Sequence, residues 1–315
     1  MIRFAEKIKR AKAFYSTVGL VILVVLSSLV SPSFRTLDNV VTIFRQASLL
    51  LIMSSGLTAV LLTGGMDLSV GATAGLAGCI CAQMIKANVT VGLAILCGLL
   101  IGAVIGVING LLSGLLPSFV ATYGTNWVIS GLGIVVMQGA VIYDLPQRFT
   151  QLGVGYVGLI PNLVIFAAII VFILFVLLTK TTLGRQIYQT GANPLAALYS
   201  AVKTKRIVLS AFILCSVCAA FAGILMTARL NAADAAMGNA YGLQTLAAAV
   251  IGGTSQKGGE GGIIGTVVGA LILTIIVNIM NITGIPSQAQ GLVIGAVIII
   301  MVLVDTLTRN RQENN

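Results

Sequence analysis

Long apolar runs, separated by short polar segments, follow one another along almost the entire chain of 315 residues. Charged residues make up 8% of the chain, whereas about a quarter of the residues in a soluble domain are charged. So few charges cannot cover a surface that faces water, and we therefore expect a lipid bilayer around the chain. A helix that crosses a bilayer needs about 20 apolar residues, so the chain has room for about ten such helices and for no soluble domain.

We predict an all-α integral membrane protein that forms a single domain over residues 1–315. The least hydrophobic spans are the third and the eighth, which we expect either to cross the bilayer or to be broken, half-membrane helices. No small-residue cleavage site follows the first apolar run, which predicts a retained first span. The predicted spans are 14–31, 47–64, 69–86, 90–113, 118–142, 161–178, 207–229, 241–256, 262–282 and 288–306.

Basic residues are distributed unequally between the two sides of these spans. Of the 18 lysines and arginines, thirteen lie in the segments of one side and five in those of the other. Cytoplasmic segments carry the excess of Lys and Arg, so we expect both termini (1–12 and 307–315) and the loop 179–206 to be cytoplasmic. The net charge of +10 therefore reflects orientation in the membrane and does not indicate a nucleic-acid partner.

Two segments, 31–46 and 143–161, are then expected to face outward. In the first, Asp38 is a plausible N-cap, and the apolar residues that follow it have the spacing of an amphipathic turn or two. This pattern predicts a short helix that lies at the outer interface of the membrane.

The polar stretch 183–197 interrupts the apolar sequence and includes the charged residue Arg185. Its loop of about 28 residues is long for a connection between two spans, and docking onto something in the water phase is the first explanation. Asn193 followed by Pro194 is a favoured start for a short helix. Small residues are expected to permit sharp turns on both sides and to present a featureless surface that fits a cleft. These small residues are Gly184, Gly191, Ala196 and Ala197.

Ionisable and amide side chains are rare in the spans, and such residues usually mark either a function or a paired structural role. Asp67 is expected either to cap the helix that follows it, as Ser69 can also do, or to have a role in substrate binding or gating. The neutral polar residues are expected either to join helices or to line a path for a neutral, hydroxyl-rich solute. Together the path candidates are Asp67, Ser69, Asn109, Thr122, Thr125, Asn126, Gln244, Asn278 and Asn281.

The chain contains no constellation that indicates an enzyme, a metal site or a bound cofactor. It has no histidine, and its five cysteines all lie in apolar runs. Cys215 and Cys218 share a helix face, where they are either a redox or metal pair or, as we favour, packing residues. The glycine-rich segment 250–262 lacks the order of a phosphate-binding loop, because Lys257 precedes Gly258 rather than Ser or Thr. We interpret it as a flexible inner turn.

Glycines four residues apart form a ridge along one face of the span 90–113. Such a ridge allows a second helix to approach closely, so we predict tight helix packing at this face. The ridge consists of Gly98, Gly102, Gly106 and Gly110.

Taken together, several segments resemble the membrane permease subunit of ribose-type ATP-binding-cassette (ABC) sugar importers. Their order and spacing match along nearly the whole chain, although two acids that are usual in the family at the start of the eighth span are absent. The matching segments are 63–71, 119–122, 124–125, 183–197, 222–223, 228–230, 247–255, 258–259, 261, 265–266 and 269–271.

This resemblance implies the permease fold of the ribose and branched-chain amino acid type, in a bacterial inner membrane. It implies a permease dimer, two cytoplasmic ATPase subunits that hydrolyse ATP, and a periplasmic or surface-tethered solute-binding protein. It also implies alternating access, with a coupling helix in the cytoplasmic loop. We map that helix to Gly184, Arg185, Gly191, Asn193, Pro194, Ala196 and Ala197. The alternatives are a permease for autoinducer-2 or another small polar solute, and an ATP-independent secondary transporter.

Overall fold

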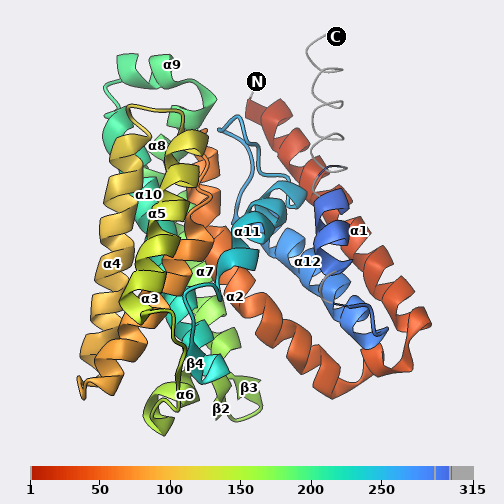
Figure 1. The fold of residues 1–315 in the computed structure, drawn as a ribbon. Helices are drawn as coiled ribbons and strands as arrows, with labels where there is room; N and C mark the ends of the chain where they lie inside the picture. The colour runs from red at the N-terminus through yellow and green to blue at the C-terminus, as the bar shows by residue number, and fades with distance from the viewer. Residues whose placement is uncertain (1, 287–288, 298, 300–315) are drawn as a thin grey trace.

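A bundle of helices makes up the protein (Figure 1). The computed structural model describes the backbone of residues 2–286, 289–297 and 299, and within these ranges the side chains from residue 16 onward. The helices are α1 (Ile2–Val30), η1 (Pro32–Arg35), α2 (Leu37–Leu62), α3 (Val70–Lys86), α4 (Val91–Leu112), α5 (Ser118–Met137), α6 (Gln147–Val154), α7 (Asn162–Lys180), α8 (Thr182–Ala192), α9 (Pro194–Tyr199), α10 (Thr204–Leu230), α11 (Asn239–Ile251) and α12 (Ile263–Ile282).

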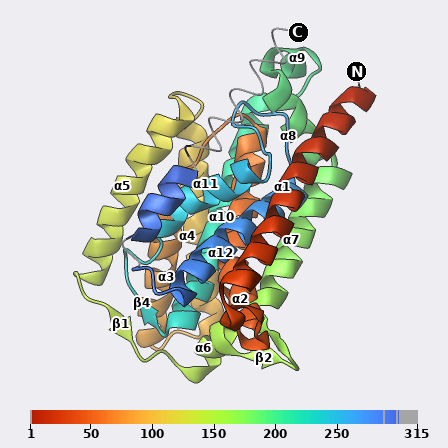
Figure 2. The same ribbon diagram turned by 90° about the vertical axis from the view of Figure 1, so that its right-hand side faces the viewer.

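Four two-residue strands form small antiparallel pairs in the connections. The pair β1 (Ile142–Tyr143) and β4 (Ala232–Ala233) joins segments that are distant in the sequence, and β2 (Tyr156–Val157) pairs with β3 (Ile160–Pro161). Figure 1 shows these strands and α6 at the end of the bundle opposite α8 and α9, while α1 begins at the α8–α9 end. In both views α1 crosses close to α12, with which it is in contact (Figures 1 and 2).

Six helices in the described part of the chain are long and apolar enough to cross a membrane: α2, α4, α5, α7, α10 and α12. The all-α multi-pass architecture is therefore confirmed, but the count of ten spans is not. With 17 and 13 residues, α3 and α11 are short. They correspond to the third and eighth predicted spans, which are the least hydrophobic ones. At about 1.5 Å per residue, α11 is too short to cross the hydrocarbon core of a bilayer.

The predicted tenth span and the tail lie largely outside the described residues. Of the span 288–306, residues 289–297 and 299 are described and helical. The tail 307–315 is not described.

The predicted outer interfacial helix is wrong, because residues 37–62 form one continuous helix, α2. Thr36, not Asp38, caps it, and its hydroxyl accepts a hydrogen bond from the Asn39 N–H at 3.3 Å. No glycine or proline interrupts the start of α2. Asn39 also exchanges two side-chain hydrogen bonds with Asn278 of α12, at 2.8 and 3.1 Å, which holds this end of α2 against the bundle.

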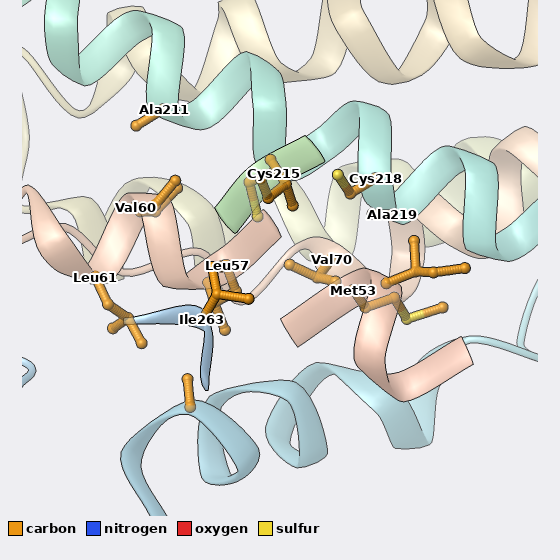
Figure 3. Packing of buried hydrophobic residues seen from close by; sticks show 14 of the residues in the cluster. Met53, Leu57, Val60, Leu61, Val70, Ala211, Cys215, Cys218, Ala219 and Ile263 are labelled. Atoms are coloured by element: carbon orange, nitrogen blue, oxygen red, sulfur yellow. The ribbon is translucent and has the colours of Figure 1, made fainter. Parts of the chain in front are cut away.

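The long helix α10 lies in the middle of the bundle and packs against α2, α3 and α4. Figure 3 shows Cys215 and Cys218 of α10 facing Leu57 and Met53 of α2 in the main apolar cluster. The two cysteines are free thiols that are 0% and 7% exposed, and among the described residues no group of metal-binding side chains exists. Their predicted packing role is confirmed.

The glycine ridge of α4 lies directly on α10, as its spacing predicts. A Cβ atom built on Gly102 would lie 2.5 Å from Ala220 Cβ and 2.7 Å from the Ser216 oxygen, and one on Gly106 would lie 2.6 Å from Ile213 Cα. Real Cβ atoms essentially never approach so closely. The two helices are therefore in contact through their backbones.

We predict that Gly106→Ala destabilises the protein by about 1–3 kcal/mol, because the added methyl group must push α4 away from α10. Gly92→Ala is the matched control, since a Cβ at this position of α4 meets nothing within 4 Å. Thermal unfolding in detergent measures both. Equal melting temperatures for the two variants would contradict the contact.

Candidate functional site

The polar stretch 183–197 forms two short helices, α8 and α9, at one end of the bundle (Figure 1). Asn193 caps α9 as predicted, with its Oδ1 accepting from the Ala196 N–H at 3.0 Å, and Pro194 occupies the first turn. Because proline presets the helical φ angle and lacks the N–H that would be unsatisfied there, this dipeptide starts the helix from local sequence alone.

Large apolar side chains form an exposed surface on α9, and this surface was not predicted from the sequence. Leu195, Leu198 and Tyr199 are 67%, 56% and 88% exposed, whereas Ala197, which we expected on the surface, is only 4% exposed. The signal was available, because residues at spacings of three and four share a helix face. An exposed group of large apolar side chains is typical of a docking surface.

Gly184 and Gly191 do not form the turns that we expected, since both lie inside α8. They permit close contact instead. A Cβ on Gly184 would overlap the carbonyl oxygens of Leu177 and Leu178 at the end of α7, and one on Gly191 would overlap the Leu62 oxygen at the end of α2. Arg185 is exposed on the same helix.

Five of the predicted path residues meet in one buried network at the connection between α2 and α3. Asp67 Oδ1 accepts from the Ser69 N–H at 2.9 Å and from the Ser69 hydroxyl at 2.6 Å. The Asn109 amide donates to Ser69 Oγ at 2.7 Å, and the Thr125 hydroxyl donates to Asn109 Oδ1 at 2.7 Å. Thr122 Oγ1 accepts from the Leu68 N–H at 3.2 Å.

This network joins the α2–α3 connection to α4 and α5. Asp67, Ser69, Asn109 and Thr122 are each at most 1% exposed. The first three are bonded to one another, whereas the Thr122 hydroxyl bonds to backbone groups of the α2–α3 connection and of α5. The arrangement supports the helix-joining alternative, because these bonds connect three parts of the chain, although the second carboxylate oxygen of Asp67, Oδ2, has no partner among the described residues. The predicted bond from Asp67 to the second residue after it is confirmed, whereas Ser69 makes no side-chain cap of its own to α3.

The remaining path candidates are distributed elsewhere. Asn278 is 3% exposed and bonded to Asn39, as described above, so it joins α2 to α12. Asn281 is exposed and accepts from the Gln290 amide at 2.7 Å. Asn126 is half-buried on α5. Gln244 lines a cavity.

That cavity, of about 390 Å³, lies between α2, α10, α11 and α12. Its polar lining consists of amides, a phenol, a hydroxyl and one guanidinium group, and among the described residues that line it only Arg229 is charged. Gln244 was predicted from the sequence, whereas the other polar lining residues were not, because they come from helices that are distant in the sequence. The polar lining residues are Gln46, Arg229, Tyr241, Gln244 and Thr274.

The sequence matches a known family of membrane transport proteins. The family model described as "Branched-chain amino acid transport system / permease component" matches residues 39–302. This chain belongs to that family of transport permeases. No solved structure matches the chain.

Curated relatives cover the chain almost from end to end. The ribose import permease protein of Bacillus subtilis is 41% identical over 291 residues, which are 91% of this chain and 90% of the relative. The ribose import permease protein of Escherichia coli K12 is 35% identical over 296 residues, 92% of each chain. The D-allose transport system permease protein of E. coli K12 is 38% identical over 290 residues, 91% of this chain and 89% of the relative. The resemblance inferred from the sequence motifs is thereby confirmed.

We predict that Asn109→Leu destabilises the permease by about 1–3 kcal/mol, because the Ser69 and Thr125 hydroxyls each lose one of their two partners in a buried site. Asn126→Leu is the control, since Asn126 has no hydrogen bond with a described residue in this network; its effect is expected to stay within about 0.5 kcal/mol. Thermal unfolding measures the difference. A stable Asn109→Leu protein would show that the network does not join these helices.

Proposed function

We propose that this chain is the membrane-spanning subunit of an ABC importer for a monosaccharide or a related polar carbohydrate. The observation that carries this proposal is the near full-length similarity to ribose and allose permeases. The chain itself is not an enzyme in this proposal, because ATP is hydrolysed by separate ATPase subunits. A second copy of the chain or a homologous permease, together with a periplasmic or surface-tethered solute-binding protein, completes the assembly.

The distribution of charge supports an orientation in the bacterial inner membrane. Basic residues flank the helix ends at the α8–α9 end of the bundle, whereas fewer basic residues occupy the opposite end. Because positive charge marks the cytoplasmic side, α8, α9 and the N-terminus face the cytoplasm. At the α8–α9 end these residues include Lys180, Arg185, Lys203, Lys205, Arg206 and Lys257.

The apolar face of α9 is the proposed docking surface for the ATPase. Leu195, Leu198 and Tyr199 project from a helix that is anchored by its N-cap and by the buried Ala197. Isolated apolar side chains on a short cytoplasmic helix gain free energy when a partner cleft removes them from water. Arg185 on α8 adds a positive charge at the same end.

The cavity between α2, α10, α11 and α12 is the proposed solute path. Amides, hydroxyls and a guanidinium can bind the hydroxyl and ring oxygens of a sugar, and the apolar part of the lining fits its C–H faces. Autoinducer-2 or another small polar solute would use the same chemistry and is the alternative substrate. Asp67, Ser69, Asn109, Thr122 and Thr125 do not line this cavity.

We predict that Leu195→Asp and Leu198→Asp each reduce co-purification of the ATPase about tenfold or more, because a charge in the docking surface resists desolvation. Both side chains are exposed, so the membrane domain should still fold. Gln189→Asp on the exposed face of α8 is the control for added charge. Normal ATPase binding by both leucine variants would place the docking surface elsewhere.

We predict that Gln244→Leu lowers the rate of sugar uptake about fivefold, because it removes a hydrogen-bonding group from the cavity. Asn281→Leu is the matched control, since Asn281 lies outside the cavity. Uptake of labelled sugar into proteoliposomes that contain the whole transporter is the measurement. A Gln244→Leu transporter with unchanged uptake and unchanged substrate preference would contradict the proposed path.

A further inference from the structure

The end of α8 meets two other segments at a point that we call the glycine junction, formed by residues 62–64, 188–192 and 257–261. The Gly259 N–H donates to the Leu62 oxygen at 3.0 Å. The Tyr188 hydroxyl donates to the Gly261 oxygen at 2.9 Å. Burial raises the pKa of Tyr188, so its hydroxyl keeps the proton of this hydrogen bond at physiological pH. These two bonds link α2 and α8 to the same loop.

Glycines allow the three backbones of the junction to touch. A Cβ on Gly191 would overlap the Leu62 oxygen and lie 2.7 Å from the Gly259 nitrogen. One on Gly258 would lie 2.8 Å from the Gly64 nitrogen and 2.9 Å from Gly191 Cα. Side chains in contact can change rotamer and slip, whereas packed backbones have low compressibility and transmit displacement. The loop that the sequence analysis interprets as a flexible inner turn is therefore packed against the ends of α2 and α8.

From the junction, the glycine-rich loop leads into a rigid helix pair. Gly252 at the end of α11 and Gly265 of α12 are so close that a Cβ on either would overlap the backbone of the other. A Cβ on Gly269 would likewise overlap the Ala248 oxygen. The helices α11 and α12 are thus in contact through their backbones and are expected to move as one body.

The three helices that leave the junction carry most of the polar lining of the cavity. Gln46 belongs to α2, Tyr241 and Gln244 belong to α11, and Thr274 belongs to α12. Arg229 belongs to α10 and is the exception. A displacement of α8 at the junction therefore acts on the cavity through two connected bodies, α2 and the α11–α12 pair.

We propose that the glycine junction transmits motion of α8 and α9 to the cavity, and that Tyr188 and Gly191 are the positioning residues that hold it together. This inference rests on the proposed function, which supplies the ATPase that moves α9. It names the elements that move together, and it makes separable predictions for transport and for ATPase binding.

The experiment uses the whole transporter, with its ATPase and its binding protein, in proteoliposomes. In Gly191→Ala and Tyr188→Phe we expect uptake to fall about tenfold and about fivefold, respectively. ATPase co-purification should be retained, and ATP hydrolysis should continue without stimulation by the sugar-loaded binding protein. Gly92→Ala and Tyr123→Phe, which change the same residue types away from the junction, should leave uptake and stimulation unchanged.

Normal uptake with normal stimulation in both junction variants would overturn the inference. Loss of ATPase binding together with uptake would also overturn it, because that result indicates a disturbed docking surface rather than lost transmission. If Gly191→Ala does not accumulate in the membrane, Tyr188→Phe, which removes only a hydroxyl group, decides the question. Absence of ATP-dependent uptake by the unaltered chain would instead contradict the proposed function.

Discussion

Contact between backbones at glycine is the interaction on which this bundle depends. In a bilayer the lipid tails are as apolar as leucine, so burial of apolar surface does not drive helices together, and close packing must do so. The ridge of α4 lies on α10, Gly265 and Gly269 of α12 lie on α11, and Gly191 of α8 lies on the end of α2. These contacts fix α4 to α10 and α11 to α12, and they join α8 to the end of α2.

The two proposed activities occupy different parts of the bundle. The apolar face of α9 projects from one end, while the cavity is lined by Arg229 at the end of α10 and by Tyr241 and Gln244 near the start of α11. Both of these helix ends point away from α8 and α9, because α10 begins and α11 ends on the α8–α9 side. A transporter of this kind needs a connection between docking and solute, and the glycine junction is the contact from which α2, α11 and α12 all extend.

Features that depend on neighbouring residues were predictable from the sequence. The four-residue spacing of the α4 glycines, the Asn193–Pro194 start of α9 and the bond from Asp67 to Ser69 were all predicted and are present. Family membership was likewise evident from motif order. The motifs identify the protein class because they were read together along the chain.

Features that depend on distant partners were not predictable. Gly191 was interpreted as a turn residue. Its actual role is to leave room for the end of α2, and that segment is remote in the sequence. For Asn278 the choice between joining helices and lining a path stayed open, because its partner, Asn39, lies in a segment that we expected to be a separate helix. The cavity likewise combines residues of four helices, of which the sequence indicated only Gln244. A polar residue in a span signals importance, whereas its role depends on which helix it faces.

The most direct test of this account is uptake of labelled ribose and allose into proteoliposomes that contain the purified chain with its ATPase and binding protein. The account predicts accumulation of one of these sugars, or of a related polar solute, only when ATP and both partners are present. Movement of the sugar through the chain alone, down its gradient or with protons, would contradict the account, because the chain would then be a secondary transporter or channel.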